Sequence, residues 1–199
     1  MKIALFVIIA LLIVGSCQKQ YTPKPRGYFR IAFPEKSYGQ LDMQLPYTFE
    51  IADYSQAVPD DGSSPQSGWI NVVTKKNKAD IHVTYVKLRD DLYKHIEESR
   101  KLAYDHSIKA DAIEEQLFIN PREQVYGSIY FIEGNAASPL QFYLTDSCTH
   151  FMRGALYIRE IPNIDSISPV IEFLKPDVIH LIETTRWTQP GSGNQAQRR

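Results

Sequence analysis

Alternating apolar and polar positions predict an antiparallel sheet in the second half of the chain. The pattern repeats every two residues over 124–132, 139–146 and 148–160, which is the period of a strand with one buried face. The stretches between these ranges, EGNAAS and DS, are rich in residues that tolerate tight turns. Because short turns cannot join parallel strands, we predict three consecutive antiparallel strands.

The first half of the chain shows shorter strand patterns. Residues 28–33 and 47–51 alternate in the same way. Residues 69–74 and 80–86 are expected to pair as a hairpin across the short segment KKNKA. The range 52–68 consists of turn-forming residues, so we predict an exposed loop there.

Two longer segments repeat at the spacing of a helix. From 88 to 108, apolar residues recur three and four positions apart, which predicts an amphipathic helix. Residues 165–187 predict either one kinked helix or two short ones, because Pro176 lacks the N–H that the helical ladder needs. The order of strands, helix, strands and helix indicates an α+β fold, an antiparallel sheet packed with helices in a single domain over 28–187.

The N-terminus carries a separate signal. Lys2 precedes an apolar run from Ile3 to Val14, which spans about 18 Å as a helix and falls short of the roughly 30 Å hydrocarbon core. This pattern predicts that 1–16 is an export signal, with a membrane-spanning helix as the alternative. The last residues, up to Cys17, resemble a bacterial lipobox. That resemblance implies cleavage before Cys17 and lipidation of its thiol, and the acyl chains would then anchor the protein to a membrane.

The ends of the mature chain are expected to lie outside the folded domain. Residues 17–27 contain two prolines and predict a semi-stiff spacer between the lipid and the domain. Residues 188–199 have no core-forming residue, so we predict a disordered tail. Gln18 rather than Asp follows the cysteine. Under the sorting rule known for enterobacterial lipoproteins, this slightly favours the outer over the inner membrane for a periplasm-facing anchor.

Charge and motifs argue against several function classes. The chain has 22 Lys and Arg against 23 Asp and Glu, a net charge of −1, whereas nucleic-acid binding needs a clear cationic excess. The five histidines show no zinc-binding spacing, and the sequence contains no phosphate-binding loop. We therefore predict no nucleic-acid partner, no metal and no cofactor.

The segment TDSCTH at 145–150 is the candidate catalytic site. Cys148 as nucleophile with His150 as base would make a cysteine hydrolase. Strand alternation instead places Cys148 on the same face as Met152 and Leu156. That placement predicts a buried, inert cysteine beside a turn, which alkylating reagents label slowly. We therefore expect a non-enzymatic protein and keep the hydrolase as an alternative.

The opposite face of the same three strands carries tyrosine and arginine side chains. Both residue types are enriched in binding hot spots, which predicts a partner-binding face. Its residues are Tyr126, Tyr130, Tyr143, Arg153, Tyr157 and Arg159. Two alternatives remain open: a helix covers this face, so that the tyrosines only pack, or the face lines a small-ligand pocket.

Three blocks of the sequence, 23–38, 148–160 and 172–187, resemble the GldD family of gliding-motility lipoproteins from the Bacteroidetes. The resemblance implies a lipid-anchored protein needed for gliding motility and the linked type IX protein secretion. It also implies action through binding to envelope proteins of that machinery, with GldE as the expected neighbour. The order of elements is similar to Mog1/PsbP-like domains. A periplasmic lipoprotein that binds glycan or peptide is the alternative function.

Overall fold

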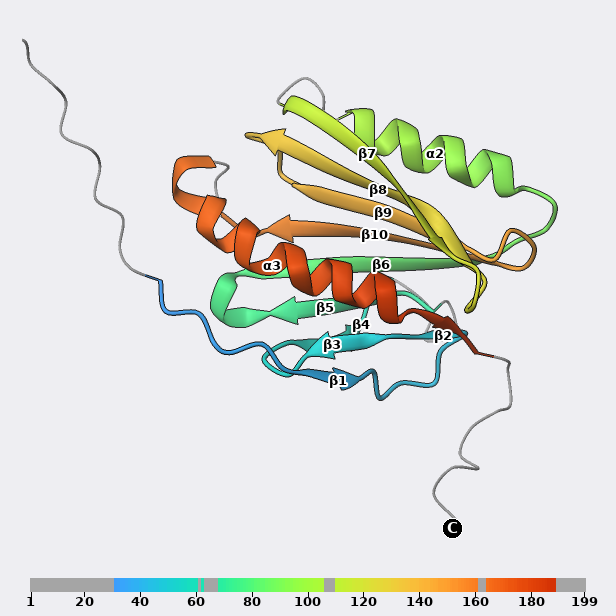
Figure 1. Ribbon diagram of the computed structural model, residues 1–199, viewed down its shortest axis with the longest axis horizontal. Helices are drawn as coiled ribbons and strands as arrows, with labels where there is room; N and C mark the ends of the chain where they lie inside the picture. The colour runs from blue at the N-terminus through green and yellow to red at the C-terminus, as the bar shows by residue number, and fades with distance from the viewer. Residues whose placement is uncertain (1–30, 61, 63–67, 106–109, 161–163, 189–199) are drawn as a thin grey trace, which may run out of the picture. The chain divides into compact units, whose positions relative to one another are not determined.

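The fold is built on a seven-stranded antiparallel sheet (Figure 1). The computed structural model describes residues 31–60, 62, 68–105, 110–160 and 164–188. The strand order is β4-β5-β6-β10-β9-β8-β7, and every neighbouring pair is antiparallel. The strands are β4 (Gln56–Pro59), β5 (Ile70–Thr74), β6 (Ala79–Lys87), β7 (Ala110–Asn120), β8 (Val125–Gly134), β9 (Leu140–Thr145) and β10 (His150–Ile158).

Two small ladders accompany the main sheet. Strand β1 (Tyr38–Gln40) pairs with β3 (Glu50–Ala52), and β2 (Tyr47–Thr48) pairs with β11 (Arg186–Trp187). A short 3₁₀ helix, η1 (Lys75–Asn77), joins β5 to β6. Because β11 follows the last helix, the β2–β11 ladder joins the C-terminal end of the described domain to an early segment of the chain.

One helix packs on each face of the sheet (Figure 1). Helix α3 (Ile164–Thr184) supplies Ile171, Leu174 and Val178 to the larger core. On the opposite face, α2 (Leu92–Tyr104) packs on a smaller cluster around Tyr143 and Phe151. A fully buried aliphatic side chain contributes about 1.5–3 kcal/mol, so most of the hydrophobic stabilisation comes from the α3 side.

The central strands match the sequence prediction. The ranges 124–132, 139–146 and 148–160 correspond to β8, β9 and β10, and the 69–74 and 80–86 hairpin is β5 with β6. Along β10, Met152 and Leu156 belong to the core under α3, whereas Phe151 belongs to the α2 cluster. The α+β class is therefore confirmed, with the two helices predicted.

Helix α3 runs through both of its prolines, so of the two alternatives predicted for 165–187 the structure shows one helix rather than two short ones. It also ends at Thr184 rather than at 187, and the chain continues as β11. Pro169 and Pro176 both lie on the exposed side of the helix. A proline in a helix has no N–H, so the carbonyl oxygen one turn earlier loses its usual hydrogen bond. Because both prolines lie on the exposed side, these unpaired positions do not face the apolar core.

Three ranges differ from the sequence prediction. The range 52–68 contains strand β4, and β7 was not predicted at all. Residues 31–33, the described part of the predicted strand 28–33, form no strand. Phe33 instead stacks on Phe173 of α3, with 4.2 Å between ring centroids, so this apolar position packs on a helix. The predicted signal 1–16, Cys17, the spacer and residues 189–199 of the predicted tail 188–199 lie outside the described residues. Thr188, the first residue of that tail, donates its N–H to the carbonyl oxygen of Pro46 at 3.0 Å.

Gly154 shows how closely the α3 face is packed. A Cβ atom at this position would lie 2.1 Å from the ring of Phe142 on the neighbouring strand β9. The Phe142 side chain is 1% exposed and occupies the space that a side chain on β10 would take. Glycine is therefore needed here for close approach of a ring to the backbone.

Candidate functional site

The carboxylate of Asp177 on α3 joins the helix to the N-terminal part of the domain. Asp177 is buried and accepts hydrogen bonds from the Tyr38 hydroxyl at 2.9 Å, from the Lys36 ammonium at 2.6 Å and from the Tyr54 hydroxyl. The same ammonium donates to the carbonyl oxygen of Phe173 at 2.7 Å, in the turn before Pro176. We call Lys36, Tyr38, Tyr54 and Asp177 the Asp177 cluster.

Aromatic contacts surround the Asp177 cluster. The Lys36 ammonium lies 3.9 Å from the ring centroid of Phe173, and the Tyr38 ring stacks on His180 at 3.8 Å. His180 in turn has its Nε2 atom 2.7 Å from a carboxylate oxygen of Glu50. Stacked rings and cation–π contacts stabilise a structure beyond the effect of the area that they bury. These contacts therefore bind residues 33–54 firmly to α3.

Burial, together with the Asp177 carboxylate, keeps the two phenols of the cluster protonated. Burial, the hydrogen bond to Asp177 and its negative charge raise the pKa of Tyr38 to about 12. The same causes, with burial first, raise the pKa of Tyr54 as well. Phenols whose pKa is raised in this way do not ionise near neutral pH, which is where a general acid or base has to gain and lose a proton. The Asp177 cluster therefore has the properties of a structural contact.

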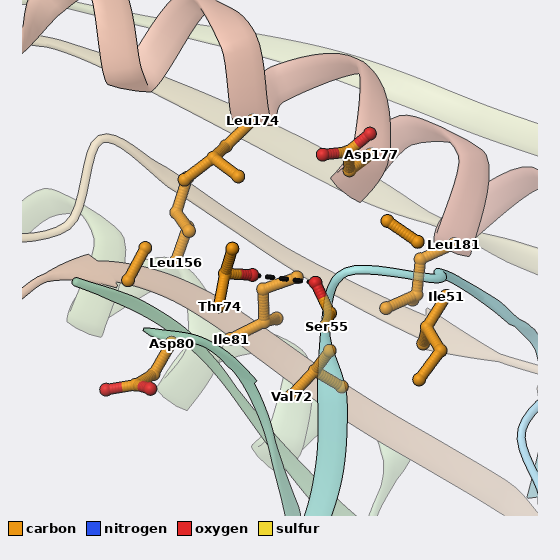
Figure 2. Close-up of a pocket in the computed structure, with 12 residues that line it drawn as sticks. Ile51, Ser55, Val72, Thr74, Asp80, Ile81, Leu156, Leu174, Asp177 and Leu181 are labelled. Atoms are coloured by element: carbon orange, nitrogen blue, oxygen red, sulfur yellow. Dashed lines mark hydrogen bonds between the residues drawn. The ribbon is translucent and has the colours of Figure 1, made fainter. Parts of the chain in front are cut away.

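A hollow beneath the Asp177 cluster, between α3 and the sheet, is too small for a ligand (Figure 2). Its volume is about 10 Å³, close to the space of one water molecule, whereas ligand pockets measure roughly 300–1,000 Å³. The hydroxyls of Ser55 and Thr74 hydrogen-bond to each other at 2.7 Å beside it. The surrounding side chains are mostly apolar, and they include Ile51, Val72, Ile81, Leu156, Leu174 and Leu181.

A second cluster joins the β6 and β10 ends to β11. The imidazole of His150 stacks on the indole of Trp187 with 5.0 Å between centroids, and its Nδ1 atom lies 2.8 Å from the Tyr85 hydroxyl. Burial lowers the pKa of His150. The imidazole is therefore held between two partners in a mainly neutral form, and one of its two nitrogens is already hydrogen-bonded.

The prediction of a buried Cys148 is wrong, because this residue is exposed. It precedes β10 in a turn organised by Asp146, whose carboxylate accepts the N–H groups of Cys148 at 2.9 Å, Thr149 at 2.7 Å and His150 at 2.8 Å. Burial opposes ionisation of Asp146, but the three N–H donors outweigh it and lower its pKa. Strand alternation does not extend to Cys148, since the turn at 146–149 breaks it.

Helix α2 covers part of the predicted partner-binding face. Tyr130 and Tyr143 are 1% and 9% exposed and pack in the cluster under α2. These two residues therefore follow the alternative in which a helix covers the tyrosines. The prediction that they form a surface is wrong for the fold as described.

The other four residues of that face remain partly or fully accessible. The guanidinium of Arg153 donates to the side-chain oxygen of Gln141 at 2.6 Å, Arg159 forms an ion pair with buried Asp80, and Tyr157 packs against His82. The fourth, Tyr126, lies on β8 directly opposite Ile119 of β7. The predicted face is thus divided into an arginine-rich part near β6 and an apolar part at the β7 edge.

Sequence reasoning missed two exposed apolar residues beside Tyr126. Leu117 is 75% and Ile119 is 64% exposed, and both belong to the unpredicted strand β7. The sequence does contain one sign of these residues, the apolar stretch LFIN that follows EEQ. This stretch does not alternate with a period of two residues, so it did not predict a strand. Across the described ranges, the histidine, cysteine and carboxylate side chains form no group able to hold a metal ion. A membrane-spanning helix is likewise absent from these ranges.

The three sequence blocks converge in space. Lys36 and Tyr38 of the first block bind Asp177 of the third, and His150 of the second block stacks on Trp187 of the third. The second block also supplies β10, at the centre of the sheet. The residues that carry the sequence resemblance are therefore residues that hold the domain together.

Comparisons with known proteins place the chain. The solution structure of cyanobacterial PsbP (CyanoP) from Synechocystis sp. PCC 6803 is similar over 80% of this chain and 98% of that one, with 11% identity and a TM-score of 0.47. PsbP is one of the two domain types to which the order of elements is similar. A search of curated proteins found no match. A family model described as gliding motility lipoprotein GldD matches residues 18–187, a range that includes all three blocks, and the chain therefore belongs to the GldD family of gliding motility lipoproteins.

Proposed function

We propose that this protein is anchored by lipid at Cys17, faces the periplasm, and supports gliding motility and type IX secretion by binding other envelope proteins. The observation that carries the proposal is the family match, which begins at residue 18, directly after the cysteine of the lipobox-like segment. A lipoprotein family implies a membrane-anchored envelope protein. The preference for the outer membrane, from Gln18, and GldE as a partner are part of the proposal.

A binding role agrees with how the polar residues are used. The side chains of the Asp177 cluster bind one another, and His150 contacts Tyr85 and Trp187. The Asp80–Arg159 pair links β6 to the end of β10. The side chains that face solvent on β7 and β8, by contrast, include an accessible tyrosine, Tyr126, next to the exposed Leu117 and Ile119, and tyrosine is enriched in interfaces.

Deletion with complementation tests this function. Cells that lack the protein should neither glide nor secrete type IX cargo, and the full chain should restore both. The variant Cys17→Ala should accumulate as an unlipidated precursor, which the mass of the membrane-extracted protein shows, and should restore neither process. A deletion strain that glides and secretes normally contradicts the proposal, as does a wild-type protein that retains residues 1–16 and carries no acyl chains.

A second candidate, a lipoprotein that binds a small glycan or peptide, rests on one observation. A hollow of about 640 Å³ opens near η1, and its lining includes Lys76, Asn77, Ile158, Glu160 and Val170. The side-chain oxygen of Asn77 is buried and has no hydrogen-bond partner among the described residues. Titration of the full chain with muropeptides or short peptides, followed by NMR, tests this candidate, since binding there must shift the Asn77 side-chain amide signal.

A further inference from the structure

One long edge of the main sheet is open. Strand β7 has eleven residues, and within the described ranges it pairs on one side only, with β8. An edge strand presents a row of backbone N–H and C=O groups that another strand can use. The opposite edge is protected in the usual way, because β4 has only four residues and ends at Pro59. The two edges therefore differ in how ready they are to accept another strand.

The last third of β7 presents apolar side chains to solvent. Leu117 lies opposite Ser128, and Ile119 lies opposite Tyr126. Residues two apart on a strand share a face, so Leu117 and Ile119 project on the α2 side of the sheet, where Tyr126 is also only partly covered. Helix α2 does not cover these two side chains, which are 75% and 64% exposed.

The first two thirds of β7 are acidic. The strand reads ADAIEEQLFIN and contains Asp111, Glu114 and Glu115 but no lysine or arginine. Glu115 is the midpoint of the strand, so a fully overlapped antiparallel pair of two copies would place Glu115 against Glu115. Like charges directly opposite each other destabilise a strand pair. The charge pattern thus disfavours a second copy and favours a basic strand.

We propose that the free edge of β7 accepts an extended segment of a partner protein as an eighth strand. The segment carries lysine or arginine where it faces Glu114 and Glu115, and apolar residues where it faces Leu117 and Ile119. Main-chain hydrogen bonds supply affinity in this mode and the side chains supply specificity. The inference rests on the proposed function, since it names the surface by which the lipoprotein binds an envelope protein.

Photo-crosslinking of the full chain in living cells tests the proposal. A benzophenone amino acid replaces Leu117 in one strain and Gln56, on the protected edge β4, in the control strain. The adduct at position 117 should contain a partner segment with neighbouring basic residues at one end and apolar residues at every second position after them, as identified by mass spectrometry, and position 56 should give none. The double change Glu114→Lys with Glu115→Lys should lower the adduct yield about tenfold, from two reversed cross-strand charge pairs.

Matched variants separate binding from folding. Glu97→Lys with Glu183→Lys changes the net charge equally on exposed helical positions, and the adduct yield should not change. Leu117→Asp with Ile119→Asp keeps the acidic character and removes the apolar part. This variant should unfold at the wild-type temperature and lose gliding. If the Leu117→Asp, Ile119→Asp variant unfolds at a lower temperature than the wild type, Glu114→Lys alone replaces it as the test. That variant should keep the wild-type unfolding temperature, and a lower adduct yield then supports the inference whereas an unchanged yield contradicts it.

Three results overturn the inference: an adduct between two copies of this chain, equal adducts at 117 and 56, or normal gliding of a folded Leu117→Asp, Ile119→Asp variant. If the deletion strain has lost gliding while that variant glides, the proposed function stands and only the β7 surface fails. If the deletion strain itself glides, the proposed function fails.

Discussion

The two faces of the main sheet are covered to different extents. On one face, the 21-residue helix α3 and the segments before β4 bury a continuous core, and the Asp177 cluster fixes their relative position. On the other, the 13-residue helix α2 covers Tyr130, Tyr143 and Phe151 but leaves the end of β7 in solvent. The face under α3 therefore provides most of the stability, whereas the face under α2 leaves large apolar side chains in solvent.

The largest expected effect compares one leucine from each side. Leu181 on α3 is 1% exposed, whereas Leu117 on β7 is 75% exposed. Leu181→Ala should lower the free energy of unfolding by about 2–5 kcal/mol, because it removes packed methyl groups and leaves a cavity. Leu117→Ala should change it by about 0.5 kcal/mol or less. Urea unfolding of both variants measures this, and equal losses would mean that β7 is covered in the free protein.

Removal of the central acceptor in the Asp177 cluster should have the next largest effect. Asp177→Ala leaves Lys36, Tyr38 and Tyr54 without their shared partner. Since these three side chains can reach some water, we expect the free energy of unfolding to fall by about 2–3 kcal/mol. Asp177→Asn keeps an oxygen acceptor and should lose less. Glu172→Ala, an exposed position on the same helix, is the control, and a loss as large as that of Asp177→Ala would refute the role of the cluster.

Alkaline pH should weaken the α3 side through Tyr38. Its pKa is raised from 10.0 to about 12 in the folded protein, so the phenol stays protonated while the unfolded chain ionises. The stabilisation is therefore fully present below pH 10 and is lost as the pH rises from 10 toward 12. The free energy of unfolding should fall less steeply in this window for Tyr38→Phe than for the wild type. Parallel curves for the two proteins would exclude this linkage.

The smallest structural effect is expected at the β9–β10 turn. Cys148 is exposed, so Cys148→Ser should change the free energy of unfolding by about 0.5 kcal/mol or less. Iodoacetamide should modify the thiol in the folded protein nearly as fast as in urea, as followed by the mass of the peptide that contains Cys148. Labelling that requires unfolding would restore the original prediction of a buried cysteine.

Local patterns predicted the central strands well and failed where a residue is not covered or not in a strand. Strands β8, β9 and β10 alternate because each has one side under α3. Strand β7 was missed because most of its side chains face solvent on both sides, so burial imposes no period on its sequence. Cys148 was misplaced because alternation was extended past the start of β10 into a turn whose geometry depends on Asp146.

The candidate surface was predicted only in part, for a similar reason. The six residues named from the sequence do project from the α2 side of the sheet, as strand alternation requires. Which of them α2 covers depends on where that helix lies, and this cannot be read from the strands. Tyr130 and Tyr143 are thus buried, whereas Tyr126 gains Leu117 and Ile119 as neighbours from a strand that the pattern did not reveal.

The sequence by itself determined the α+β class, the central strands, the side to which each of their residues points, and the family. These follow from backbone geometry with a period of two or 3.6 residues, which is local. Only the tertiary structure decided that Asp177 meets Lys36, 141 positions away, and Tyr54, 123 positions away, and that one sheet edge stays open. Such contacts depend on how distant segments dock, and docking is governed by the fit between surfaces that no single stretch of sequence contains.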